Sequence, residues 1–140
     1  MEYRKIDNHY VVRMEKGDEV TEKLLELCRK ENIRLGSLVG LGASNHVSIG
    51  LFDDKTKVYN EKTLEGPMEI TSLVGNITTM NGEPYLHCHI NVCDDEMRIY
   101  GGHMTECRIS VTGEIFVTPL DGTVERKHDE SIGVNLFSFK

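Results

Sequence analysis

Short runs of alternating polar and apolar residues, separated by turn-forming residues, extend along most of this chain. The clearest run, YLHCHINV at residues 85–92, consists largely of strand formers and lies between the turn-like segments NGEP and CDDE. Similar runs predict strands over residues 10–14, 37–44, 45–53, 57–66, 68–80, 96–104, 106–120 and 133–139. Glycine-rich breaks between these runs indicate bends or close approaches of the backbone.

One segment, residues 17–36, has helical periodicity instead. Gly17 and Asp18 provide an N-cap, acidic residues follow in the first turn, and Arg29 and Lys30 occupy the last turn. The apolar stripe, which should pack on a sheet, consists of Val20, Leu24, Leu27 and Cys28. One helix followed by many antiparallel strands predicts an α+β fold, in which a mainly antiparallel β-sheet forms one layer and the main helix packs on it.

The length of 140 residues favours a single domain over residues 1–140, which is large enough to bury a core without disulfides. Sixteen Lys and Arg against 23 Asp and Glu give a formal charge of -7 without any polybasic run, which disfavours nucleic-acid binding. No apolar leader is present, and no run approaches the ~18 apolar residues of a membrane span. The four cysteines form no CxxC pair and are expected to be free thiols. These features predict a cytoplasmic protein that does not contact a membrane.

The strand at residues 85–92 carries two histidines, which is unusual enough to require an explanation. Side chains alternate along a strand, so His87 and His89 share one face, whereas the apolar residues take the opposite face. The two Cα atoms lie about 6.6 Å apart at a rise of about 3.3 Å per residue. This spacing suits two nitrogens that converge on one small target. The alternative is a pair of solvated surface histidines.

A third histidine, His103, follows Gly101 and Gly102 directly after the strand MRIY. If its strand forms a hairpin with the HxH strand, His103 can approach the other two histidines, although the turn residues alone do not fix the register. Three neutral imidazoles with open positions are typical of a divalent metal site that accepts water or substrate. Imidazole suits zinc, copper, iron and nickel alike, so the residues alone do not select the metal.

Five segments, GLGAS, LEGPMEITSLVGNI, EPYLHCHINV, GGHM and TGEIFV, occur in the order and spacing of the PPC domain. This is the plants-and-prokaryotes-conserved domain, which accompanies AT-hooks in plants. The chain resembles the prokaryotic stand-alone type of this family, most strongly over residues 10–119. The resemblance implies a layered fold with a mainly antiparallel sheet, a homotrimer and, as in some prokaryotic members, a metal held by His87, His89 and His103. We expect this metal to be zinc.

The family also carries a DNA-binding label. This chain has no AT-hook of the Arg-Gly-Arg-Pro type, and its net charge of -7 disfavours contact with a phosphate backbone. DNA therefore remains a partner suggested by the label, beside the chain itself in a homotrimer and a small-molecule ligand.

Glu69 and Glu114 match acidic positions of the family motifs. A carboxylate near a metal can orient a ligating imidazole or act as a general base on bound water, so both are candidate catalytic residues. The alternative is an acid on a strand face, at a rim or a trimer contact. Asn76 is a candidate turn residue, and His46 either lines the same cleft or lies in a solvated loop.

Three functional hypotheses remain open. The first is a homotrimeric binding module that holds a divalent metal and recognises a small ligand or a regulatory partner. The second is an enzyme in which metal-activated water attacks a small substrate and Glu69 or Glu114 carries the proton. The third is a DNA-binding regulator, which rests on the family label alone. The residues do not decide whether a reaction is catalysed.

Overall fold

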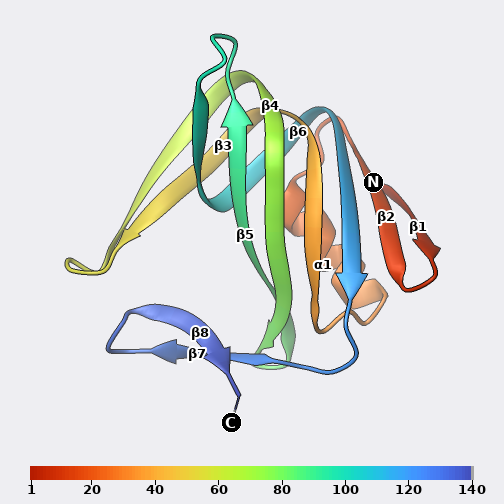
Figure 1. The fold of residues 1–140 in the computed structure, drawn as a ribbon, viewed down its shortest axis with the longest axis vertical. Helices are drawn as coiled ribbons and strands as arrows, with labels where there is room; N and C mark the ends of the chain where they lie inside the picture. Colours follow the sequence, from red (N-terminus) through yellow and green to blue (C-terminus); the bar gives the residue numbers. More distant parts are fainter. Residues whose placement is uncertain (140) are drawn as a thin grey trace.

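The computed structural model describes residues 1–139, which form eight β-strands and one helix (Figure 1). The helix is α1 (Val20–Lys30), and the strands are β1 (Glu2–Ile6), β2 (His9–Glu15), β3 (Gly36–Asp53), β4 (Val58–Met80), β5 (Glu83–Cys93), β6 (Ile99–Pro119), β7 (Glu125–Asp129) and β8 (Val134–Ser138). Within the described chain, all strand pairings are antiparallel except the contact between β4 and β7. The predicted combination of a mainly antiparallel sheet and one helix is confirmed.

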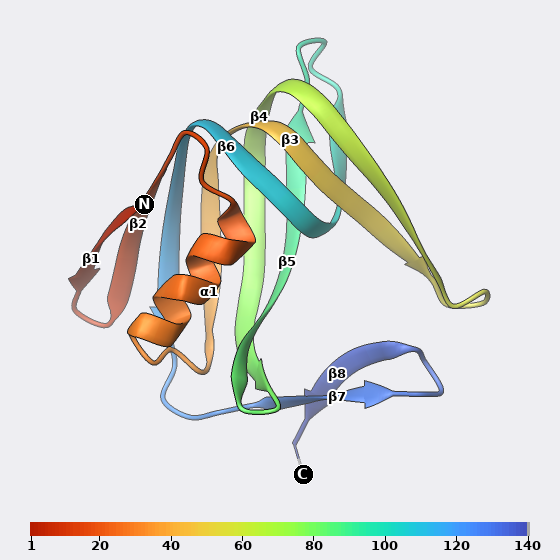
Figure 2. The same ribbon diagram turned by 180° about the vertical axis from the view of Figure 1, so that it is seen from behind.

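Four long strands form a closed ring of pairings. The sheet order is β1-β2-β6-β3-β4-β7-β8, and β5 pairs with both β4 and β6. The first residues of β6 pair with β5, whereas the rest of β6 pairs with β3. The ring therefore runs from β3 to β4, β5, β6 and back to β3. Helix α1 lies beside β5 and β6, as Figure 2 shows, and the β7–β8 hairpin lies at the opposite end from the β5–β6 turn.

Long, bent strands replace several separate strands that the sequence predicts. The runs 37–44 and 45–53 join in β3, and the same holds for the paired runs within β4 and β6. Register shifts in β3 mark β-bulges, which bend a strand without ending it. At one of them the buried Ser44 hydroxyl donates to the carbonyl of Arg108 (2.7 Å) and accepts from the N–H of His46 (3.2 Å). The predicted breaks were wrong for this reason.

The start of α1 differs by one residue from the prediction. Glu19, and not Asp18, is the N-cap, because its carboxylate accepts hydrogen bonds from the backbone N–H groups of Thr21 (3.2 Å) and Glu22 (2.7 Å). Asp18 instead accepts from the backbone N–H of Glu15 at 2.9 Å. The acidic first turn was predicted correctly. The sequence alone does not distinguish Asp18 from Glu19 as the N-cap, because both side chains can accept hydrogen bonds from the first turn and tertiary contacts decide between them.

The helix ends at Lys30, well before the predicted limit at residue 36. Asn32 adopts a left-handed φ of 53°, a conformation that terminates helices. The apolar stripe is confirmed, since Val20, Leu24, Leu27 and Cys28 are all at most 1% exposed. It packs with the inner faces of the strands in one hydrophobic core. Within residues 1–139 there is no helix with the length and apolar character needed to cross a bilayer.

Candidate metal centre

The two histidines of β5 lie on the face of the sheet that is turned away from the hydrophobic core. Cys88 and Ile90, which alternate with them, are 3% and 1% exposed, whereas His87 is half-buried and His89 is exposed. The predicted alternation is confirmed, because β5 buries its apolar residues and directs both imidazoles to the other side.

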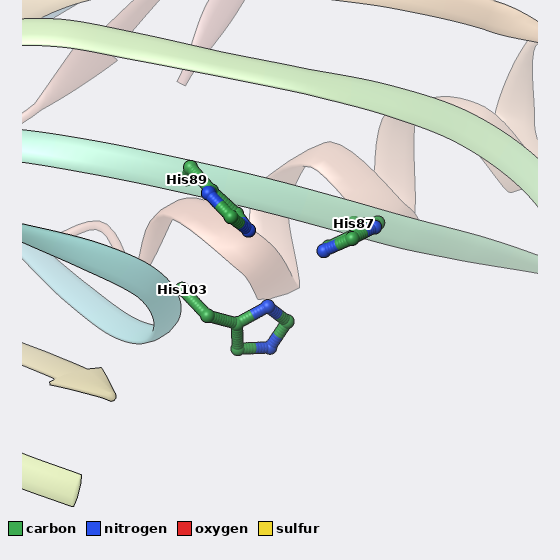
Figure 3. Close-up of side chains that lie close together, drawn as sticks. All are labelled: His87, His89 and His103. Atoms are coloured by element: carbon green, nitrogen blue, oxygen red, sulfur yellow. The ribbon is translucent and has the colours of Figure 1, made fainter. Parts of the chain in front are cut away.

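His103 comes from the start of β6 and lies directly opposite His89 in the β5–β6 pairing. It also pairs with Gly50 of β3, so it occupies the point where β6 leaves β5 and joins β3. Figure 3 shows the three imidazole rings directed toward a common space. The register that the sequence left open thus brings His103 to the HxH pair.

Two glycines before His103 allow this placement. A Cβ atom on Gly102 would lie 2.8 Å from the carbonyl oxygen of Gly50, and one on Gly101 would overlap the side chain of Asn91. Real Cβ atoms essentially never make contacts below 3.0 Å. Glycine therefore lets β6 approach β5 and β3 closely at this point, which fixes the position of His103.

The three rings are close enough to share one metal ion. Their centroids are 5.1 Å apart for His87–His89 and for His87–His103, and 5.7 Å apart for His89–His103. One ring nitrogen from each lies within 4.8 Å of the others. Two nitrogens bound tetrahedrally to zinc at about 2.0–2.1 Å are about 3.4 Å apart, so modest ring rotations complete a three-nitrogen site.

Burial favours the neutral form of the His87 and His103 imidazoles, which is the form that binds metal. Burial lowers the pKa of His87 to about 4, with further contributions from the neighbouring charges of His103, Arg126 and His89. Burial also lowers the pKa of His103, followed by the effect of His89. Within residues 1–139 no protein group forms a hydrogen bond with any of the three rings, so their nitrogen lone pairs are available.

This donor set fits a divalent metal with room for a further ligand. Three imidazole nitrogens leave at least one position of a tetrahedral ion for water or substrate. The thiol of Cys88 lies on the core side and is 3% exposed, so it does not close the site. A bound ion would act there as a Lewis acid toward an oxygen ligand.

Two residues near the histidines carry no sequence signal that marks them as part of a site. The Tyr59 hydroxyl donates to the backbone carbonyl of His103 at 3.3 Å, and its ring packs edge-on against the imidazole at a centroid distance of 5.6 Å. Arg126 of β7 binds Asn76, which lies directly opposite His87. Tyr59 follows a polar turn, and Arg126 belongs to the charged run ERKHDE, which reads as a solvated surface.

The structure does not bring Glu69 or Glu114 to the histidines within one chain. Glu69 lies opposite Cys93, four residues from His89, or about 13 Å along β5 at about 3.3 Å per residue. Glu114 lies eleven residues after His103 on β6. Both carboxylates are exposed. Their role as proton carriers stays a prediction.

Asn76 and His46 occupy positions that the sequence did not indicate. Asn76 is a residue in the middle of β4 and not a turn residue, and its side-chain carbonyl accepts a hydrogen bond from Arg126 at 2.8 Å. His46 lies in β3, where Nδ1 contacts Glu65 at 2.6 Å and Nε2 contacts Glu106 at 3.3 Å. His46 is not part of the histidine cluster, which consists of His87, His89 and His103.

Three solved structures have the same fold and similar sequences. A candidate DNA-binding protein of Bacteroides thetaiotaomicron is 33% identical with a TM-score of 0.96, and the match covers 99% of this chain and 96% of that chain. A metal-containing protein of Archaeoglobus fulgidus is 30% identical with a TM-score of 0.88, over 98% and 96% of the two chains. A plant- and prokaryote-conserved protein of Pyrococcus horikoshii is 28% identical with a TM-score of 0.86, over 98% and 93%.

A search of curated proteins finds no match. A family model described as the Plants and Prokaryotes Conserved (PCC) domain matches residues 1–121, a range that includes all three histidines. This match confirms the resemblance carried by the five sequence motifs. The chain therefore belongs to the Plants and Prokaryotes Conserved (PCC) domain family.

Proposed function

We propose that this protein is a homotrimeric binding module that holds one divalent metal ion per subunit through His87, His89 and His103. The open coordination position binds a small ligand, and zinc is the expected metal. One observation carries the proposal, namely the convergence of three imidazoles without hydrogen-bond partners in the described chain. The 30% identity to a metal-containing protein of Archaeoglobus fulgidus supports it.

An apolar row on the outer face of the sheet supports self-association. Val39 lies opposite Phe116 on one side and opposite Val74 on the other, and these side chains are 54%, 50% and 50% exposed. Val74 in turn lies opposite His89, so the row extends to the histidine cluster. Contiguous exposed apolar side chains are typical of protein–protein interfaces, and a trimer would cover them.

The proposed location is the cytoplasm. Cys28, Cys88 and Cys107 are buried free thiols, and Cys93 is a partly exposed free thiol. Thiols remain reduced in that compartment, which supports this part of the proposal.

A metal-dependent enzyme is the second candidate function. A metal held by three neutral imidazoles can lower the pKa of bound water and supply a nucleophile at neutral pH. Glu69 or Glu114 would then carry the proton. Because both lie far from the cluster in one chain, this role requires a neighbouring subunit to supply the carboxylate.

DNA binding is the weaker alternative. It rests on similarity to proteins such as the candidate DNA-binding protein of Bacteroides thetaiotaomicron. The formal charge of -7 opposes contact with phosphates. A gel shift at low salt checks this alternative, because phosphate contacts give an affinity that falls steeply as salt is added.

Elemental analysis of the purified protein, combined with light scattering, tests the main proposal. We expect one metal ion per subunit and a solution mass three times that of the monomer. Dialysis against EDTA should remove the metal, and added zinc should restore one equivalent. A protein that takes up no zinc, or that remains monomeric over a wide concentration range, would contradict the proposal. Turnover of a small substrate would favour the enzyme instead.

A further inference from the structure

A buried arginine without an ion-pair partner lies beside the histidine cluster. Arg126 is only 5% exposed, yet it forms no ion pair with any carboxylate of residues 1–139. Its hydrogen bonds go to neutral acceptors. Nε donates to the Thr78 hydroxyl (2.9 Å), Nη1 donates to the carbonyl of Asn135 (2.9 Å), and Nη2 donates to the side-chain carbonyl of Asn76 (2.8 Å).

Two aromatic rings complete the surroundings of this guanidinium. It lies over the rings of Tyr85 and Phe137, at 5.0 Å and 4.5 Å from their centroids. Aromatic faces and neutral acceptors stabilise a cation without cancelling its charge. Buried charges in proteins are ordinarily paired with an opposite charge. Among residues 1–139, Arg126 therefore lacks the anion that such a site usually contains.

The register of the strands places this charge next to His87. Asn76 and Thr78 lie directly opposite His87 and Tyr85 in the β4–β5 pairing, and paired residues project on the same face of a sheet. Because Arg126 binds both Asn76 and Thr78, its guanidinium lies on the histidine face. The effect of Arg126 on the pKa of His87 agrees with this placement.

The guanidinium retains capacity for a further acceptor. It has five N–H groups, of which the three described hydrogen bonds use three, so that one remains on each terminal nitrogen. Carboxylates are the natural planar partners of guanidinium groups. A divalent ion on the three imidazoles would add a second positive charge on the same face of the sheet.

We propose that the metal site binds a small carboxylate, with one oxygen in the open metal position and Arg126 as the counter-charge that selects an anion over a neutral ligand. The inference rests on the proposed metal binding and assigns a ligand class to the same site. Arg126 belongs to β7, so the β7–β8 hairpin supplies this selectivity. The hairpin lies outside residues 1–121, which match the family model.

Cobalt(II)-loaded protein provides the test, since the visible spectrum of the ion changes when an added ligand enters its open position. Wild type, Arg126→Gln and Arg126→Lys are titrated with acetate and, separately, with imidazole as a neutral ligand. In Arg126→Gln we expect acetate affinity to fall about tenfold or more and imidazole affinity to change less than about twofold. Arg126→Lys keeps the charge and should recover most of the acetate affinity. Lys127→Gln removes an exposed charge from the same strand and should behave as wild type.

Each outcome separates the two levels of the proposal. Equal acetate affinities in wild type and Arg126→Gln would overturn the role of Arg126 while metal binding stands. Equal losses of acetate and imidazole affinity, without rescue by Arg126→Lys, would show that Arg126 is only a structural anchor of the hairpin. This result would also overturn its role in selecting an anion. Wild type that binds no cobalt would refute the metal site itself, and this is visible before any acetate is added.

Discussion

His89 and His103 face each other across the β5–β6 pairing, at the point where β6 leaves β5 for β3. This cross-strand relationship turns a local HxH motif into a cluster of three imidazoles, because His87 already shares a face with His89. The proposed metal binding therefore depends on the pairing of two strands as well as on the identity of three residues. Variants that disturb the pairing should lose metal before they lose the fold.

Removal of one imidazole should abolish zinc-dependent stabilisation. A metal that binds only the folded state adds about 2.7 kcal/mol at a hundredfold excess over its dissociation constant. His103→Ala leaves two ligands, so added zinc should no longer raise its melting temperature. Thermal unfolding with zinc and with EDTA measures the difference.

The matched control for that experiment is His9→Ala, which removes an exposed histidine far from the cluster in sequence and outside its contacts. It should retain the full response to zinc and change stability within about ±0.5 kcal/mol. Equal zinc content in wild type and His103→Ala after identical dialysis would place the metal elsewhere.

Gly102→Ala should displace His103 without removing it. The new Cβ would lie 2.8 Å from the carbonyl oxygen of Gly50, so β6 must move away from β3. Overpacking of this kind costs about 1–3 kcal/mol, and we expect zinc stoichiometry to fall as well. Elemental analysis after dialysis, together with thermal unfolding, measures both effects.

Gly82→Ala separates loss of the site from loss of stability in general. Gly82 has a φ of 81° in the β4–β5 turn, and an alanine there costs about 1–2 kcal/mol. This variant should be destabilised but should keep one zinc per subunit. Parallel loss of zinc in both variants would show that the Gly102 effect is not specific to His103.

His46 should stabilise the protein in acid more than in alkali. Burial alone lowers its pKa, but hydrogen bonds and charges of Glu65 and Glu106 outweigh burial and raise the pKa above its ordinary value. Arg108, the partner of His46 in the β3–β6 register, binds Glu106 at 3.2 Å. A raised folded-state pKa gives stability that is present below the unfolded value near 6.5 and is lost as pH rises through the folded value.

His46→Gln should therefore lower the melting temperature more at about pH 5.5 than at about pH 8.5. Wild type and His46→Gln are both measured in EDTA, so that metal binding does not contribute to the pH dependence. A larger effect on the alkaline side would mean that the two carboxylates do not stabilise the protonated ring.

Charge placed in the apolar row of Val39, Val74 and Phe116 should break the proposed trimer. An unpaired carboxylate buried in an interface costs several kcal/mol, so Val39→Glu should shift the solution mass toward that of the monomer. Leu51→Glu is the matched control, because Leu51 is 72% exposed but does not belong to the row. Light scattering compares the two variants, and equal masses would exclude this face as the interface.

Periodicity in the sequence was enough to assign faces but not the ends of elements. The stripe from Val20 to Cys28 and the buried Cys88 and Ile90 are found where the pattern predicts them. The limits of β3 could not be predicted, because the hydroxyl of Ser44 satisfies backbone groups at a bulge that joins two apparent strands. β1 and β7 carry mostly charged residues, EYRKI and ERKHD, and pair as short strands that no apolar alternation marks.

The histidine cluster was predictable because two of its members share one strand and the third follows within a single hairpin. Arg126 was not, since its contact with Asn76 joins residues that are 50 positions apart. Contacts of this separation arise from packing of the β7–β8 hairpin, which no local pattern describes. The same reason applies to Tyr59, which lies 44 positions before His103 and donates a hydrogen bond to its backbone carbonyl.

The β5–β6 pairing is the shortest link in the closed ring, with five residue pairs from His89–His103 to Cys93–Ile99. One histidine of the cluster lies on β6 and two lie on β5, so a bound ion would connect the two strands on the outer face of the sheet. Spontaneous opening of the β5–β6 pairing should then require release of the metal. A bound metal should therefore slow hydrogen exchange of the amides at the start of β6. Metal occupancy would thus control how often the ring of strands opens locally, an effect that reaches beyond the three side chains that hold the ion.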